Sequence, residues 1–120
     1  MRRIYQTSTK IDNFCCMPAC ISSLTDIELG QLDYSETKWF VSIREQMRKF
    51  GYTLGFPKKM VPGRKYIKIV MYEDWGHAVI SNHNGKVLHN PLNKLMPNEV
   101  RKSRKYRFPE DDYYIQVTKL

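Results

Sequence analysis

Three cysteines lie close together near the start of the chain, within residues 14–24. Cys16 has the best position for nucleophilic chemistry, because the residues after it have helical spacing and Pro18 fits only the first turn of a helix. A helix N-terminus and a nearby imidazolium both lower the pKa of a thiol, and the thiolate is the reactive form. We therefore predict a nucleophile at Cys16 and expect Cys20, one turn further on, to be a small packing residue.

Two other interpretations of this stretch stay open. Cys15, Cys16 and Cys20 can all be ordinary buried cysteines. A metal site is the second alternative, because Cys16 and Cys20 are four residues apart and can share one face of a helix. Three cysteines with no CxxC or HxxxH pair do not complete a tetrahedral ligand set, so we expect no metal and no other cofactor.

A histidine and an amide that can serve such a cysteine occur in a predicted hairpin. One strand opens at His77, the Asn84-Gly85 pair is typical of a hairpin turn, and the partner strand ends at Asn90. Antiparallel pairing brings the open ends of the two strands close together. An amide beside a histidine can fix its ring orientation and tautomer, which is the third role in a nucleophile, base and orienting-group set.

The elements that must position these residues are two helices followed by an antiparallel sheet. The first helix is predicted from Cys16 to about Ile27. The second follows an N-cap at Ser35 and ends before Gly51. Its buried stripe is expected to contain Trp39, Phe40, Ile43, Met47 and Phe50. The expected strands are residues 2–6, 52–56, 66–72, 77–81, 86–89 and 113–118, and the expected loops are residues 7–13, 57–64 and 92–110. Helices followed by a sheet indicate an α+β layer arrangement.

Length and composition indicate one domain, residues 1–120, with enough apolar side chains for a core. No apolar run approaches the length of a membrane span, and residues 1–6 carry charge but no apolar signal segment. The cysteine count is odd and two cysteines are adjacent, which is a poor basis for a disulfide framework. We therefore expect a cytoplasmic protein that does not bind a membrane.

The formal net charge is +8 and the sequence pI is about 9.5. Much of the positive charge lies in residues 101–107 and in the stretch from Lys58 to Lys68. This balance permits binding to nucleic acid or to acidic proteins. We favour a solvated basic loop, because no zinc-finger, RNP or KH signature supports nucleic-acid binding.

The two motifs together resemble those of papain-like cysteine peptidases of the small bacterial and phage type. These are related to the double-glycine bacteriocin-processing peptidases and to bacterial transglutaminase-like cysteine proteases. Their nucleophile segment, Cys-x-x-Ala-Cys-x-x-Ser-Leu, is matched by residues 16–24. Their second segment, His-Ala-Val followed by Gly-Lys-Val and Asp-Pro or Asn-Pro, is matched within residues 77–91. The resemblance implies a papain-like fold with the nucleophile helix and the second helix packed on the sheet.

The resemblance also implies a cysteine hydrolase that cleaves peptide or isopeptide amides of a protein or peptide substrate. Cys16, His77 and Asn90 would form its triad. Gln6 matches the upstream glutamine whose amide donates to the oxyanion, although its spacing of ten residues to Cys16 is longer than in the double-glycine peptidases. Two further departures are Asn90 in place of the commoner aspartate and Cys15 where relatives carry a small or polar residue.

Three alternatives remain. The same triad can deamidate glutamine or transfer acyl groups. A catalytically inactive papain-like module could instead bind a host or partner protein through a basic face, in the host cytoplasm if the protein is phage-encoded. Nucleic-acid binding through residues 101–107 is the third alternative. Trp75 and the loop 57–64 flank the expected site and would set its specificity.

Overall fold

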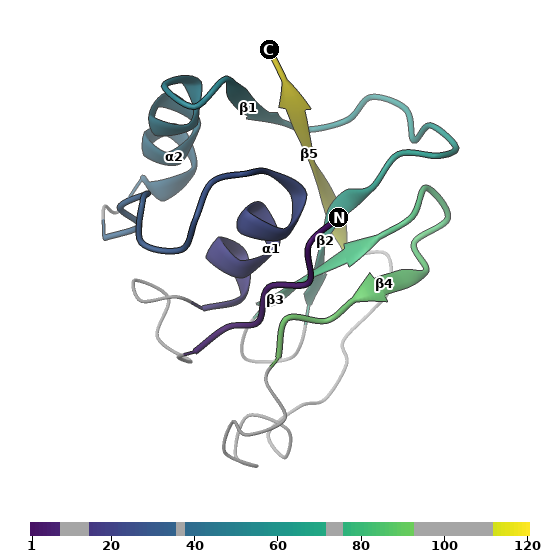
Figure 1. Cartoon of the computed structure of the whole chain (residues 1–120). Helices are drawn as coiled ribbons and strands as arrows, with labels where there is room; N and C mark the ends of the chain where they lie inside the picture. Colours follow the sequence, from purple (N-terminus) through teal and green to yellow (C-terminus); the bar gives the residue numbers. More distant parts are fainter. Residues whose placement is uncertain (8–14, 36–37, 72–75, 93–111) are drawn as a thin grey trace.

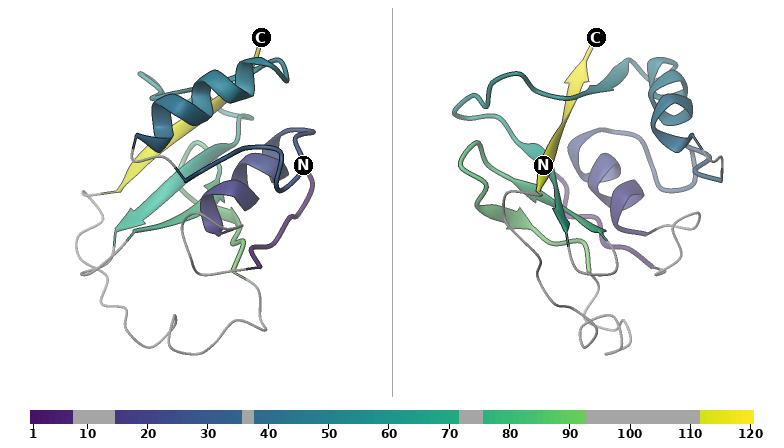
Figure 2. Two further views of the ribbon diagram at one scale, coloured as in Figure 1. Left: turned by 90° about the vertical axis from the view of Figure 1, so that its left-hand side faces the viewer. Right: turned by 180° about the vertical axis from the view of Figure 1, so that it is seen from behind.

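The computed structural model describes residues 1–7, 15–35, 38–71, 76–92 and 112–120. It contains two helices, α1 (Cys16–Leu24) and α2 (Trp39–Arg48). Its strands are β1 (Tyr52–Gly55), β2 (Tyr66–Met71), β3 (Gly76–Ser81), β4 (Val87–His89) and β5 (Tyr113–Lys119). The strands form one sheet in the order β1-β5-β2-β3-β4, and every neighbouring pair is antiparallel. Both helices lie on the same side of the sheet (Figures 1 and 2). The predicted α+β arrangement is therefore confirmed.

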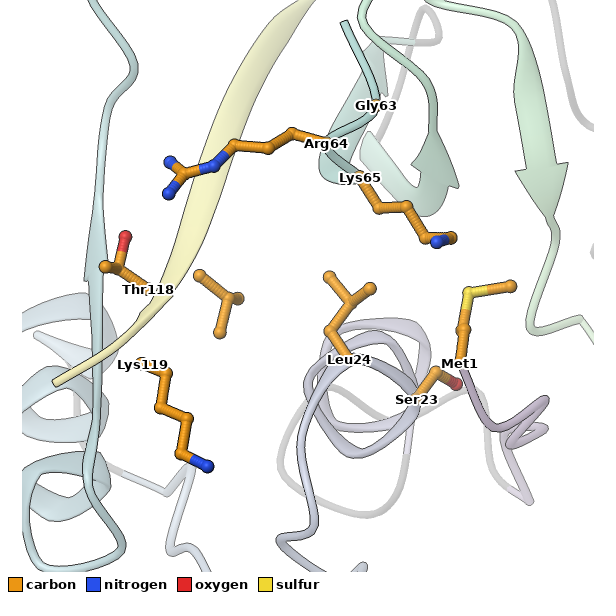
Figure 3. A pocket seen from close by; sticks show the side chains of 9 residues that line it. Met1, Ser23, Leu24, Gly63, Arg64, Lys65, Thr118 and Lys119 are labelled. Atoms are coloured by element: carbon orange, nitrogen blue, oxygen red, sulfur yellow. The ribbon is translucent and has the colours of Figure 1, made fainter. Parts of the chain in front are cut away.

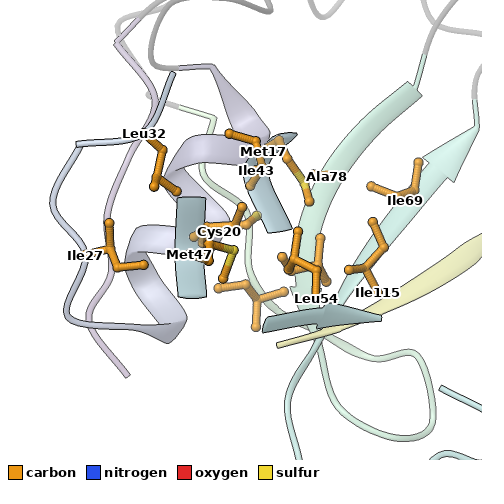
Figure 4. Close-up of a cluster of buried hydrophobic side chains, with 13 residues drawn as sticks. Met17, Cys20, Ile27, Leu32, Ile43, Met47, Leu54, Ile69, Ala78 and Ile115 are labelled. Atoms are coloured by element: carbon orange, nitrogen blue, oxygen red, sulfur yellow. The ribbon is translucent and has the colours of Figure 1, made fainter. Parts of the chain in front are cut away.

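The core lies between the two helices and the sheet (Figure 4). Cys20 of α1 is fully buried there, as predicted for a packing residue. Ile43 and Met47 face the core from α2, because residues four apart share one face of a helix. Ile67 and Ile115 complete the cluster from the sheet. Truncating one such side chain to alanine typically costs about 2–5 kcal/mol, so this cluster fixes how α1 sits on the sheet.

The structure corrects the prediction of a strand at residues 2–6, where no strand is present. The backbone N–H groups of this segment bond to several different elements. Arg2 N donates to Ser23 O, Ile4 N donates to Ser23 Oγ, and Gln6 N donates to Pro91 O. No single neighbouring strand supplies the acceptors, so a ladder cannot form. The segment instead joins α1 to the chain that follows β4.

Helix α1 ends at Leu24, earlier than predicted. Thr25 is extended, with φ −132° and ψ −176°, and its hydroxyl donates to Ile21 O while accepting a hydrogen bond from Ile27 N. The guanidinium of Arg2 donates through Nη2 to the carbonyls of Ser22, Thr25 and Ile27. These contacts satisfy the carbonyl groups that a longer helix would have used internally.

The prediction of Ser35 as the N-cap of the second helix is wrong. The N-cap of α2 is Lys38, and no side chain caps it. Ser35 instead bonds to the carboxylate of Asp33 through both its backbone N–H and its hydroxyl, a local turn that competes with capping. The end of α2 agrees with prediction, since Gly51 has a φ of 86°. The buried stripe is shorter than predicted, because Phe50 is 38% exposed.

The five strands predicted from residue 52 onward all occur, each within one residue of its expected ends. Residues 8–13 and 93–110 of the predicted loops lie outside the described residues, and so do Trp75 and the basic segment 101–107. In the described part of the chain, neither helix combines the length and the apolar character needed to cross a membrane.

Candidate active site

Helix α1 begins at Cys16 and therefore places this residue at the positive end of the helix dipole. Cys15 precedes it as the N-cap in extended conformation, with φ −84° and ψ −161°. Cys16 is partly exposed, whereas Cys15 and Cys20 are buried. All three are free thiols. Cys16 is therefore the only one of the three that a reagent or substrate can reach without moving the core.

Strands β3 and β4 bring His77 and Asn90 together at their open end. The turn between them has Gly85 at φ 84°, where its N–H donates to Asn82 O. His77 is only 2% exposed, and its Nε2 lies 2.8 Å from Oδ1 of Asn90. Oδ1 also accepts the backbone N–H of Leu92 at 3.1 Å. Because Oδ1 can only accept, Nε2 of His77 is the donor and carries a proton. The predicted pairing of this histidine with this amide is present.

The Cys16 sulfur hydrogen-bonds with the side chain of His77 and with the backbone N–H of Ala78. Since Asn90 engages Nε2 of His77, Nδ1 is the ring nitrogen left for the sulfur. Cysteine, histidine and asparagine are thus joined by two consecutive hydrogen bonds. This is the arrangement that lets a base activate a nucleophile while a third group orients the base.

Electrostatics distinguish Cys16 from its neighbours. The pKa of Cys16 is lowered to about 4, first by a hydrogen bond with the Cys15 thiol and then by the hydrogen bond and charge of His77, against the opposing effect of burial. The pKa of Cys15 is raised by that same hydrogen bond and by burial, and burial raises the pKa of Cys20. Burial, followed by the nearness of Cys15 and Cys20, also raises the pKa of Tyr34. The negative charge of this cluster is therefore concentrated on Cys16.

Gln6 is brought to the same region by its backbone, because its N–H donates to Pro91 O at 2.8 Å. Pro91 directly follows Asn90, and the side chain of Gln6 is buried. The N-terminal segment is held there by His89, whose ring Nε2 is 2.8 Å from Ile4 O. All four residues expected at the site from sequence thus lie on segments that meet at one end of α1 and the hairpin.

Two positioning residues were missed by the sequence analysis. His89 holds the N-terminal segment through Ile4, and the ring of Tyr5 packs edge-on against it at 5.0 Å. Arg2 ties the same segment to the end of α1. The position of His89 next to Asn90 could have indicated its role. No sequence pattern indicates the role of Arg2, since its acceptors are carbonyls twenty or more residues away.

The described residues contain no group of three or more His, Cys, Asp or Glu side chains that could hold a metal ion. In comparisons with family models, with curated proteins and with solved structures, no match to the chain was found.

Replacing Cys15 by alanine should raise the pKa of Cys16, because it removes the thiol that donates to the Cys16 sulfur. Cys15→Ser is the matched variant, since a hydroxyl keeps a donor at that position. We expect the alanine variant to be alkylated by iodoacetamide several-fold more slowly than the wild type at pH 5.5, and the serine variant to remain close to it. Equal rates for all three proteins would show that Cys15 does not tune Cys16.

Proposed function

We propose that the protein is a papain-like cysteine hydrolase that cleaves peptide or isopeptide amides, with a triad of Cys16, His77 and Asn90. The observation that carries the proposal is the hydrogen-bonded series from the Cys16 sulfur through His77 to Asn90. Cys16 is the first residue of a helix packed on a sheet, in which β3 carries the histidine and the amide directly follows β4. This is the layout expected from the resemblance to papain-like peptidases. The three free thiols fit the reducing cytoplasm.

In the first step, the Cys16 thiolate attacks the carbonyl carbon of the amide and forms a carbon–sulfur bond, while the carbonyl oxygen becomes an oxyanion. His77, protonated in the ion pair, then gives its proton to the leaving amine as the carbon–nitrogen bond breaks. In the second step, His77 takes a proton from water as that water attacks the thioester. The acid product leaves and the thiolate is restored. Asn90 keeps the ring of His77 in one orientation throughout.

The oxyanion has two candidate donors. The N–H of Cys16 belongs to the first turn of α1, whose N–H groups have no acceptor within the helix. The side-chain amide of Gln6 is the second donor, carried to the site by the bond between Gln6 N and Pro91 O. This role is supported by the bond of Gln6 N to Pro91 O, which holds the N-terminal segment next to Asn90.

Gln6→Ala is expected to lower kcat by about 10²- to 10³-fold, because one oxyanion donor typically contributes about 3 kcal/mol to the transition state. KM should change little, since the ground-state carbonyl needs this donor less. Gln31→Ala is the matched control, because Gln31 is exposed and its side chain, among the contacts described, only accepts the N–H of Glu28. A Gln6→Ala enzyme that keeps its kcat within a few-fold would remove Gln6 from the oxyanion site.

The reaction class can be tested by incubating the wild type and Cys16→Ala with a pool of peptides in ¹⁸O-labelled water. A hydrolase leaves ¹⁸O in new C-terminal carboxyl groups, and a deamidase leaves it in glutamates derived from glutamine. An acyl transferase supplied with an amine forms new amides that lack the label. Backbone or isopeptide cleavage by the wild type alone is the expected result. No product of any kind would favour the inactive binding module.

A further inference from the structure

A pocket of about 410 Å³ lies at the end of α1 that is remote from Cys16 (Figure 3). Leu24 lines it from the end of α1, Arg64 and Lys65 line it from the loop before β2, and Thr118 and Lys119 line it from the end of β5. None of the triad residues contributes to its lining. The pocket is therefore a separate feature of the molecule.

Positive charge dominates this pocket. Arg64, Lys65 and Lys119 are all exposed, and no acidic side chain is among the lining residues. Within the described ranges, none of the three makes an ion pair with a carboxylate. The C-terminal end of a helix carries a partial negative charge. At the end of α1, the guanidinium of Arg2 donates to the carbonyl groups of Ser22 and Thr25 and offsets this charge.

The remaining lining residues restrict the kind of anion that fits. Leu24 and Val117 add apolar surface to the lining. The hydroxyl of Thr118 accepts a hydrogen bond from Gln116 Nε2, and its own O–H can donate to a ligand. The lining contains no aromatic ring on which a base could stack, which sites for single-stranded nucleic acid generally provide. A lining that combines apolar and basic side chains favours a peptide over a nucleic acid.

We propose that this pocket binds an acidic peptide segment, with carboxylates paired to Arg64, Lys65 and Lys119 and one aliphatic side chain seated on Leu24 and Val117. Helix α1 rises about 1.5 Å per residue, so its two ends are about 12 Å apart. A peptide bound here leaves Cys16 unobstructed. If the bound acidic segment is part of the substrate, which rests on the proposed function, the pocket is an exosite. It would select acidic protein substrates.

The test is the binding of a fluorescein-labelled peptide of sequence EELEE, followed by fluorescence anisotropy with the full chain at low salt. The pocket variant combines Arg64→Ala, Lys65→Ala and Lys119→Ala. The matched control removes three exposed lysines that do not line the pocket, namely Lys38, Lys49 and Lys86. Each exposed charge pair contributes roughly a factor of two in affinity, so the pocket variant should bind about tenfold more weakly. The control should bind within about twofold of the wild type.

Equal losses in the two variants would overturn the proposal, because they would show attraction to net charge alone. No detectable binding at millimolar peptide would also overturn it. A ten-nucleotide oligothymidylate is tested in the same way. If it binds more tightly than EELEE and its binding depends on the same three residues, the ligand of the pocket is nucleic acid and the peptide proposal is overturned. The assay measures binding without turnover, so the result tests the peptide site independently of the proposed hydrolysis. If EELEE binds while peptide cleavage is absent, the pocket is a peptide site of a non-enzymatic module.

Discussion

Cys16→Ala should lower the rate of amide hydrolysis by at least about a thousandfold, which is the largest effect expected from any single substitution in this chain. The physical reason is that Cys16 alone combines a reachable sulfur, a helix N-terminus and a hydrogen bond to His77. The measurement is kcat/KM on a substrate identified from the labelled-water experiment. The fold should persist, because Cys16 is only partly buried.

The controls for this variant are Cys15→Ala and Cys20→Ala. Both should retain much of the activity, since Cys15 tunes the Cys16 sulfur through a hydrogen bond and Cys20 packs in the core. Loss of turnover in Cys15→Ala together with full turnover in Cys16→Ala would show that the nucleophile had been assigned to the wrong cysteine.

His77→Ala should produce the second largest effect, again roughly a thousandfold or more in kcat. Removing the imidazole takes away the partner that helps lower the pKa of Cys16. It also removes the group that we propose protonates the leaving amine. The loss should be greatest at mildly acidic pH, because a thiol with a higher pKa is mostly protonated there. The pH profile of kcat/KM for the wild type and the variant measures both parts of the effect.

His83→Ala is the matched control for this variant, because His83 lies in the turn at the other end of the hairpin and should leave turnover unchanged. The double variant Cys16→Ala/His77→Ala should be no slower than Cys16→Ala alone, since the two residues act as a unit. Losses that multiply in the double variant would contradict a shared mechanism.

Sequence patterns predicted best the elements that depend on local spacing. The stripe containing Ile43 and Met47 and the glycine at position 51 defined α2, and the Asn84-Gly85 turn defined the hairpin. The hairpin brings the end of β4 toward the start of β3, so the nearness of His77 and Asn90 was expected from sequence. The register shift at Ile80 and Ser81 was not. The features that were predicted need no knowledge of contacts between remote parts of the chain.

Features that depend on remote contacts were mispredicted or missed. The backbone of the N-terminal segment bonds first to Ser23 and then to Pro91, which belong to different elements, so the strand predicted at residues 2–6 does not form. The contacts of Arg2 with carbonyls beyond α1 and of His89 with Ile4 join residues far apart in sequence. The hydrogen bond from Cys15 to Cys16 depends on the backbone at the N-cap, which residue types alone do not determine.

The rate of alkylation of each cysteine against pH, read by mass spectrometry on the native protein, tests the central claim most directly. We expect Cys16 to be the cysteine that reacts. Its reactivity should persist well below pH 8.5, the ordinary range of a thiol, and fall only as the pH approaches its lowered pKa of about 4. Uniformly slow reaction of all three cysteines with ordinary thiol pKa values would contradict an activated nucleophile.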